Sequence, residues 1–288
     1  RDDLVTGVQT CALPISSNHN NMKGIIIAAG RGSRLGGITD NTPKTLLEVH
    51  GVTFLERIIH AMRSHGVKDI CVIVGYQGHM IKERVGGQPG ITFRDNVTWA
   101  DNNILGSLAN AHDFMDEKED VICTYSDIVM SDSSIADIVA APADAPVMIQ
   151  IDNEFADYYE GRSDHPLGEA ENVIWGLKTM SAIEVGKIIP HKHDAMGEFT
   201  GVVRLTGEGQ KIWKDLYAGK LMELGPEKPW MRAKHFRIAY LTDMLQYIVS
   251  IGKTVRCVIG KKQVMEVDTA QDLQIARDIT KGREGDKE

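Results

Sequence analysis

The stretch GIIIAAGRGSRL at residues 24–35, with TPKTLLE at 42–48, decides the fold of this chain. Residues 24–29 are an apolar run that is too short for a helix, so they predict a buried strand. Gly30 and Gly32 follow at once, and glycine lets backbone N–H groups approach an anion without obstruction by a side chain. The stretch therefore predicts a strand that ends in a loop open to an anionic ligand.

Three cations accompany this loop, and they predict that its ligand is a phosphate. Arg31 and Arg34 lie within the loop, and Lys44 follows it. Lys44 stands too far after Gly32, and behind a proline, for the P-loop pattern, which needs Gly-Lys-Ser/Thr. The dinucleotide pattern needs a third glycine at a fixed distance, and Gly36 does not fit it. The chain therefore carries a phosphate loop of another kind.

Strands and helices alternate after the loop, as they do in parallel sheets. Apolar residues at helical spacing predict a helix over 53–64, and the run at 69–75 predicts a second buried strand. A short helix over 79–85 leads to a third strand at 91–94. This order predicts an α/β fold with a doubly wound, mostly parallel sheet, which binds ligands at the carboxyl ends of its strands.

Composition restricts the classes of partner. The 32 basic and 40 acidic residues give a formal net charge of −8, which argues against a nucleic-acid partner. No apolar run reaches the roughly 18 residues that span a bilayer, so no membrane partner is expected. The four cysteines lack metal-ligand spacing, and buried thiols in a cytoplasmic protein are expected.

The two ends of the chain are expected to lie outside the folded domain. Residues 1–21 are interpreted as a non-native or disordered leader, because VTGVQTCALPI at 5–15 is what a sequencing-library adapter gives when translated. A signal peptide is the alternative, but the stretch lacks a continuous apolar core. A single domain is expected over 22–280, with a polar insertion at about 153–200 and a frayed tail at 281–288.

The loop resembles the signature A-A-G-x-G-S/T-R-L, spacer, P-K of the nucleotidyltransferases that make nucleoside-diphosphate sugars and CDP-alcohols. The match covers residues 24–48, although Gly36-Gly37 stands where sugar-activating members usually have Arg-Pro. The resemblance implies a Rossmann-like nucleotidyltransferase fold. It also implies that Arg34 and Lys44 act on the phosphates of the nucleotide, and that the loop binds the nucleotide through Ala28, Ala29, Gly30, Gly32 and Ser33.

A second stretch of the resemblance lies at 99–108, WADNNILGSL. Either Asn102 or Asn103 is expected to cap a helix over 104–115. In the resembled enzymes an N-N-x-x-S-L segment lies beside the nucleotide, so Asn102, Asn103 and Ser107 are candidate nucleotide ligands. A cap alone and a cap that also contacts the ligand are both left open.

Two aspartates are candidate Mg²⁺ ligands by the same resemblance. Asp127 stands near the end of a predicted strand over 121–129, where a carboxylate is costly unless it is paired or on a metal. The alternative is that Asp127 caps a helix over 131–140. Asp268 lies in the pattern E-x-D-T-x-x-D at 266–272, which resembles the second metal motif of the family. Mg²⁺ is thus the implied cofactor.

The second half of the chain alternates like a half-exposed antiparallel ribbon, and the resembled enzymes build their acceptor pocket there. A zwitterionic acceptor needs a carboxylate or an aromatic ring for its ammonium and a basic residue for its phosphonate. The candidate acceptor residues are Asp152, Tyr158, Arg162, Glu171, Lys178 and Glu198.

The overall pattern most resembles the cytidylyltransferases of phosphonate biosynthesis, from 23 to about 279. That resemblance implies transfer from CTP to a phosphonate such as 2-aminoethylphosphonate. A phosphocholine or sugar-1-phosphate nucleotidylyltransferase is the closest alternative, and a non-catalytic nucleotide-sensing domain is the alternative from another class. The apolar face of a predicted helix over 233–250 is expected to pack in the core, with self-association into a homodimer as its alternative.

Overall fold

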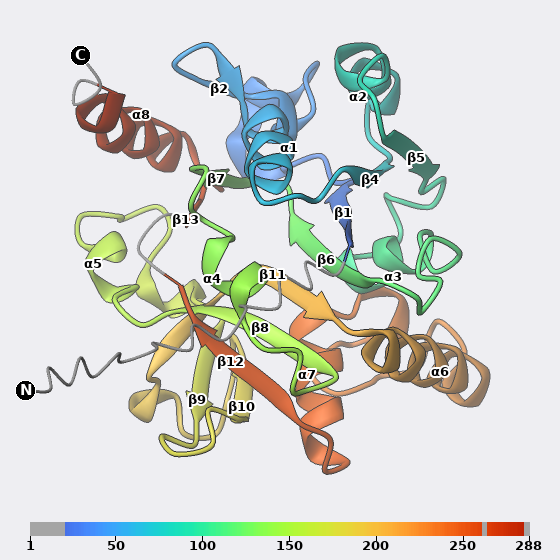
Figure 1. Ribbon diagram of the computed structural model, residues 1–288. Coiled ribbons are helices and arrows are strands. Elements are labelled where there is room, and N and C mark those ends of the chain that lie inside the picture. Colours follow the sequence, from blue (N-terminus) through green and yellow to red (C-terminus); the bar gives the residue numbers. More distant parts are fainter. Residues whose placement is uncertain (1–20, 261–263, 285–288) are drawn as a thin grey trace, which may run out of the picture.

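Four parallel strands form the centre of the fold (Figure 1). The computed structural model describes residues 21–260 and 264–284, so residues 1–20 of the predicted leader lie outside it. Strand β1 (Met22–Ala28) lies between β4 (Asp69–Val74) and β6 (Asp120–Tyr125), and β5 (Ile91–Asp95) pairs with β4. All three pairings are parallel, which confirms the predicted mostly parallel centre.

An antiparallel half is joined to this centre by β11 (Gly197–Leu205), which pairs with β6. β11 also pairs with β8 (Val147–Asp152), and β12 (Val255–Ile259) lies parallel to β8. At its other end β11 pairs with β9 (Asn172–Trp175), which forms an antiparallel pair with β10 (Ala182–Gly186). Strand β11 therefore connects the parallel strands at the centre of the fold to the half of the chain that was predicted to form an antiparallel ribbon.

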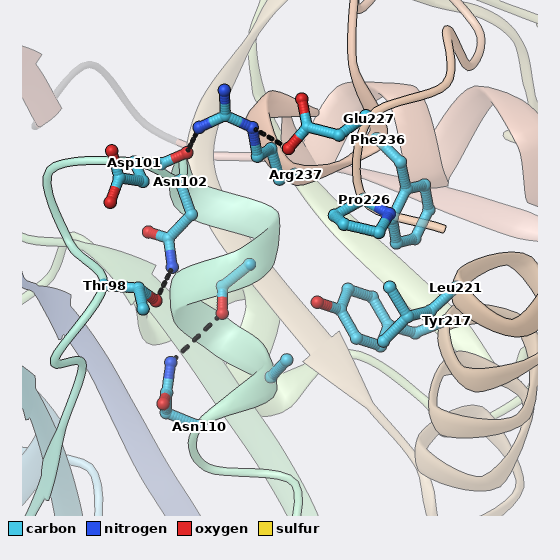
Figure 2. Close-up of a pocket in the computed structure, with 12 residues that line it drawn as sticks. Thr98, Asp101, Asn102, Asn110, Tyr217, Leu221, Pro226, Glu227, Phe236 and Arg237 are labelled. Carbon is cyan, nitrogen blue, oxygen red and sulfur yellow. Dashed lines mark hydrogen bonds and ion pairs between the residues drawn. The ribbon is translucent and has the colours of Figure 1, made fainter. Parts of the chain in front are cut away.

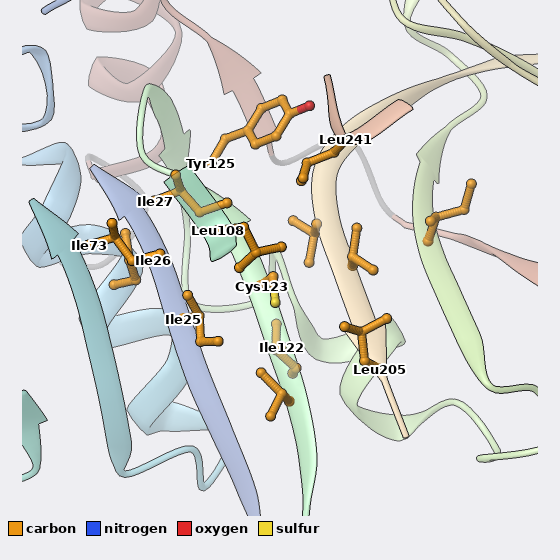
Figure 3. Close-up of a cluster of buried hydrophobic side chains, with 14 of the residues drawn as sticks. Ile25, Ile26, Ile27, Ile73, Leu108, Ile122, Cys123, Tyr125, Leu205 and Leu241 are labelled. Atoms are coloured by element: carbon orange, nitrogen blue, oxygen red, sulfur yellow. The ribbon is translucent and has the colours of Figure 1, made fainter. Parts of the chain in front are cut away.

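The core lies on both faces of the parallel strands. Ile25 and Ile26 on β1, and Ile122 and Cys123 on β6, are completely buried; Figure 3 shows them on adjacent strands, with Leu205 of β11 on the other side of β6. Continuous β-branched runs of this kind are typical of strands covered on both sides. The burial also explains why β1 lacks alternating polar residues from Gly24 to Ala28.

Helices cover the sheet and fix its loops. Helix α1 (Phe54–Ser64) begins with a capping box between Thr53 and Glu56. Helix α3 (Ile104–Ala109) contacts β1, α6 (Gly207–Leu224) contacts β6 and β11, and α7 (Leu241–Ser250) contacts β10 and β12. The other elements are η1 (Ser33–Thr39), η2 (Lys44–Leu46), β2 (Glu48–Val49), β3 (Val52–Thr53), α2 (Gly78–Val85), β7 (Ile128–Met130), α4 (Ala136–Ala140), α5 (Ala156–Tyr159), η3 (Leu167–Glu169), η4 (Lys192–Asp194), η5 (Phe236–Ile238), β13 (Val264–Glu266) and α8 (Ala270–Glu284).

Two predicted helices are shorter than expected. The helix expected over 104–115 ends at Ala109, where the Asn110 side chain donates to the carbonyls of Gly106 and Ser107. The helix expected over 233–250 begins only at Leu241, because residues 237–239 serve another element. The carbonyls of Arg237 and Ala239 accept from the backbone N–H groups of Asn103 and Leu105 at the start of α3.

Local hydrogen bonds also correct the region around 121–140. The predicted strand is divided into β6 and β7 by a bend at Ser126 and Asp127. The predicted helix over 131–140 begins only at Ala136. Its first turn is replaced by a serine turn in which the Ser134 hydroxyl accepts from the Ser131 N–H. At the other end of the chain, α8 continues to Glu284, four residues beyond the predicted domain limit of 280.

The predicted apolar face on α7 is part of the core. Leu241, Met244, Leu245 and Ile248 are all completely buried within the chain. Core packing is therefore confirmed for this face, and the homodimer stays a prediction. Within 21–260 and 264–284, none of the helices combines the length and the apolar character needed to cross a bilayer.

Candidate active site

The signature loop brings a buried lysine against its second glycine. Gly32 has φ +73°, and a Cβ there would lie 2.7 Å from Cδ of Lys44. A side chain at this position would therefore be strained and would also displace the lysine. Gly30, Ser33 and Arg34 are exposed residues of the loop, while Ala28 and Ala29 are buried at the end of β1.

The Lys44 ammonium joins the two aspartates that are more than a hundred residues apart in the sequence. Its Nζ lies 2.9 Å from Oδ2 of Asp127 and also forms an ion pair with Asp268. Strand β13 pairs with β7, and the N–H of Val267 donates to the carbonyl of Asp127, so backbone pairing places the two carboxylates together. Arg34 forms an ion pair with the second oxygen of Asp268.

These contacts determine the charge states of the groups. Burial alone would lower the pKa of Lys44, but the carboxylates of Asp127 and Asp268 outweigh it and raise that pKa above the usual value. Burial would raise the pKa of Asp268, and the Lys44 ammonium outweighs it and lowers that pKa. Both groups are therefore charged at neutral pH.

The carboxylates fit a divalent cation. Oδ1 of Asp127 is buried and accepts no hydrogen bond from the described residues, and such an oxygen is a natural metal ligand. Glu266 adds a third carboxylate, whose pKa is raised well above the usual value by burial and by the charges of Asp268 and Asp127. His165, Glu266 and Asp268 each offer a ligand atom within 4.8 Å of the others. Repulsion among these carboxylates would be relieved by a metal.

Two of these groups were missed from the sequence. Glu266 stands in the quoted E-x-D pattern but was not assigned as a ligand. His165 lies in the irregular insertion, where no spacing links it to residues a hundred positions further on. Its Nε2 is buried without a hydrogen-bond partner among the described residues and lies 4.0 Å from Oε2 of Glu266.

The predicted nucleotide residues of the 99–108 stretch form one hydrogen-bonded cluster. Asn103 caps α3 by accepting from the N–H of Ile104 at 2.8 Å, which confirms the predicted cap. Asn96, which the sequence did not single out, donates to the side chains of both Asn102 and Ser107 at 2.9 Å. The cluster fixes the start of α3, and its contact with a nucleotide stays a prediction.

Buried carboxylates occupy the predicted acceptor side. Glu171 accepts from the hydroxyls of Tyr125 at 3.1 Å and Thr242 at 3.2 Å. Glu198 accepts from the hydroxyl of Tyr159 at 2.5 Å and lies opposite Asp152 in the β11–β8 pairing. Burial raises the pKa of Glu171 and the pKa of Glu198 to about 7 each.

One cation in this region was not predicted. Lys187 follows β10, and its Nζ lies 3.5 Å from Glu169. Burial would lower the pKa of Lys187, but Glu266, Glu171 and Glu169 outweigh it and raise that pKa. Lys187 is therefore a charged lysine whose ammonium interacts with Glu266 of the metal motif and with Glu171 of the acceptor side.

Two predicted acceptor residues do not join this group. Arg162 is buried, and its guanidinium binds Asp272 and the carbonyl of Glu266. Lys178 is exposed in the turn between β9 and β10, at the opposite end of β9 from Glu171. The side chain of Tyr158 lies outside the described part of the chain, whereas the neighbouring Tyr159 contacts Glu198.

A cleft of about 690 Å³ lies between α3, α6 and residues 226–237. Figure 2 shows Arg237 reaching across it to Glu227 and to the main-chain oxygen of Asp101, at 2.9 and 2.8 Å. Asn102 is the one predicted site residue that lines it, and the carboxylates around Lys44 do not. The cleft is thus distinct from the carboxylate cluster.

The phosphate loop, the lysine and the paired carboxylates at the carboxyl ends of β1 and β6 define a nucleotidyltransferase. The chain belongs to the family of the MobA-like NTP transferase domain, whose model matches residues 24–184. The protein is therefore an enzyme of the nucleotidyltransferase class.

Several relatives of known activity are similar to this chain over most of their length. CTP:phosphoglutamine cytidylyltransferase of Campylobacter jejuni is 24% identical, over 88% of this chain and 98% of the relative. The 2-aminoethylphosphonate cytidylyltransferase of Lancefieldella rimae is 27% identical, over 72% and 84%. Among solved structures, the inositol-1-phosphate CTP transferase from T. maritima has a TM-score of 0.68 at 18% identity, covering 91% of this chain and 98% of that one. This structural likeness confirms the fold.

Proposed function

We propose that this enzyme transfers the cytidylyl group of CTP, with Mg²⁺, to a phosphonate that carries an amine, such as 2-aminoethylphosphonate. The products are a CMP-phosphonate and pyrophosphate. The observation that carries the amine is a pair of carboxylates on the acceptor side, the buried Glu171 and the partly buried Glu198, whose pKa values are raised by burial. A buried carboxylate is stabilised by a cation that donates hydrogen bonds, as a primary ammonium does. The similarity to cytidylyltransferases supports the nucleotide and the reaction.

The reaction is an in-line displacement at the α-phosphorus of CTP. An oxygen of the phosphonate forms a new P–O bond, and the bond from the α-phosphorus to the pyrophosphate oxygen breaks. Asp127, Asp268 and Glu266 would hold the metal, which supplies positive charge against the phosphate oxygens when bound. Lys44 and Arg34 lie close enough to these carboxylates to stabilise the charge of the same phosphates.

The acceptor is oriented by charge at its two ends. The Lys187 ammonium interacts with both Glu266 and Glu171, so Lys187 is our candidate for binding the phosphonate, in place of Arg162 and Lys178. Glu171 and Glu198 would bind the ammonium. Holding a dianion against the α-phosphate is the main requirement of this reaction, because no covalent intermediate is needed.

The test is pyrophosphate release with Mg²⁺, CTP and 2-aminoethylphosphonate. Phosphocholine, glucose-1-phosphate and unsubstituted ethylphosphonate are run beside it, and UTP replaces CTP in a second series. We expect release with the aminophosphonate and a much slower rate with ethylphosphonate, which lacks the ammonium. Equal rates for these two phosphonates would contradict the role of Glu171 and Glu198. Release with phosphocholine or the sugar phosphate alone would assign another acceptor, and binding of CTP without turnover of any acceptor would favour a sensing domain.

A further inference from the structure

A buried ion pair connects the insertion to the segment that carries Glu266 and Asp268. Arg162 Nε donates to Oδ1 of Asp272 at 2.8 Å, and the two side chains are 2% and 0% exposed. The guanidinium also donates through Nη2 to the carbonyl of Glu266 at 3.1 Å. Arg162 therefore donates hydrogen bonds to both ends of the segment 266–272, although it stands 110 residues before Asp272 in the chain.

The second oxygen of Asp272 fixes the backbone of this segment. Oδ2 accepts from the N–H groups of Asp268 and Thr269, each at 2.9 Å. The Thr269 hydroxyl accepts in return from the N–H of Asp272 at 3.1 Å, which completes a capping box at the start of α8. Asp272 thus sets the backbone position of Asp268 itself.

We propose that Arg162 is a positioning residue, which through Asp272 and the Glu266 carbonyl holds Glu266 and Asp268 in the arrangement that binds the metal. The inference rests on the proposed function, because it takes Asp268 as a metal ligand. A fully buried carboxylate such as Asp272 needs a compensating cation, and removal of Arg162 takes away its guanidinium partner and leaves His165 as its remaining side-chain partner, at 3.1 Å. The segment would then loosen, and the ligands on it would lose their preorganisation.

The experiment measures metal binding directly, without substrates. Free Mn²⁺ is followed by electron paramagnetic resonance as it is titrated into the purified protein and into Arg162→Met and Arg162→Lys. Loss of a partner outside the ligand shell typically weakens metal affinity about 10–100-fold. We expect that loss for Arg162→Met and a smaller one for Arg162→Lys, because an ammonium cannot bind Asp272 and the carbonyl in the same fork geometry.

Arg204 offers a matched control within the same fold. It forms a buried pair with Asp120 at 2.7 Å, with exposures of 4% and 9%, and its guanidinium also donates to main-chain carbonyls. Arg204→Met should lower the thermal midpoint, as Arg162→Met does, and should keep the Mn²⁺ affinity of the wild type. An equal loss of affinity in both variants would show a general effect of destabilisation and would overturn the proposal.

Asp268→Asn separates the two proposals. Weaker binding in Asp268→Asn, together with unchanged binding in both Arg162 variants, would overturn the positioning role alone. Unchanged binding in Asp268→Asn would overturn the metal site of the proposed function, and the positioning role with it. Circular dichroism checks that each variant folds, and Arg162→Lys decides the question if Arg162→Met does not fold.

Discussion

Lys44 is the residue through which the signature loop meets the carboxylates. It is almost fully buried, yet its charge is retained because Asp127 and Asp268 lie on either side of the ammonium. A buried lysine with two carboxylates is expensive to maintain unless it serves a charged ligand. Its position was predictable from the P-K motif, but its two partners were brought together only by the pairing of β13 with β7.

Replacing Lys44 by alanine should slow the reaction, and it should also lower the thermal midpoint because Asp268 loses a buried partner. The variant loses one preorganised donor for the phosphate, which typically costs about 10²–10³ in rate. Pyrophosphate release at saturating CTP measures the loss, and Lys253→Ala, at an exposed lysine, is the control. A rate within twofold of the wild type would remove Lys44 from the catalytic group.

The pKa of Glu171 predicts a dependence of stability on pH. Burial raises it to about 7, above the roughly 4.3 of an unfolded chain. Between these values the folded state holds a proton that the unfolded state has lost. The free energy of unfolding should therefore fall as pH rises from about 4.5 to 7, and the contribution of Glu171 should be constant above that window.

Glu171→Gln tests this sign, because glutamine does not titrate. Urea unfolding of the metal-free protein at pH 5.5, 6.5 and 7.5 should show the wild type losing stability relative to the variant across the series. Parallel profiles for the two proteins would mean that Glu171 is charged throughout and that its hydrogen bonds from Tyr125 and Thr242 outweigh burial.

At the scale of the element, the strands were more predictable than the helix ends. A buried strand such as β6 is specified by its own apolar residues, so its position can be read locally. The start of α7 is decided elsewhere, because the carbonyls of Arg237 and Ala239 are used by the start of α3. The spacing of apolar residues within 233–250 does not indicate that this stretch accepts hydrogen bonds from residues 103 and 105.

The signature loop itself gives the clearest prediction for an element. Gly32→Ala places a Cβ at positive φ and within 2.9 Å of Cβ of Lys44. We expect a loss of about 1–2 kcal/mol in stability from the backbone conformation and a reduced rate from the displaced lysine. Thermal midpoints and pyrophosphate release measure the two effects.

Gly37→Ala is the matched control in the same loop. Its backbone has no positive φ, and the nearest atom to an added Cβ is 3.9 Å away. It should leave the midpoint and the rate close to those of the wild type. If Gly32→Ala and Gly37→Ala lower the rate equally, the loop depends on general flexibility and not on the contact between Gly32 and Lys44.

At the scale of the molecule, the site is assembled from segments that lie far apart in the sequence. The motif residues at 30–44, 127 and 268 could be found one by one, because each stands in a recognisable local pattern. Lys187 and His165 could not be found in this way. They become important only when the insertion folds against the segment that carries Glu266 and Asp268. The prediction for Arg162 meets the same limit. Its charge indicated an anionic ligand, and the fold supplied Asp272 as that ligand.

A site built from such distant segments predicts that its ligands stabilise the whole fold. The complex of Mg²⁺ with CTP, bound as one ligand only to the folded state at about 100 times its Kd, would add about 2.7 kcal/mol. For a chain of this size that is an increase of about 5–10 °C in the thermal midpoint, in one transition. Asp268→Asn should lose most of the increase, whereas Asp278→Asn, at an exposed aspartate of α8, should keep it. Asp268 lies just before α8, and Lys44 lies in the first half of the chain. A thermal unfolding transition that divides into two on ligand binding would therefore mean that the ligands contact only one of these two segments. The carboxylates around Lys44 would then be joined by the lysine alone, and the metal would have to bind elsewhere.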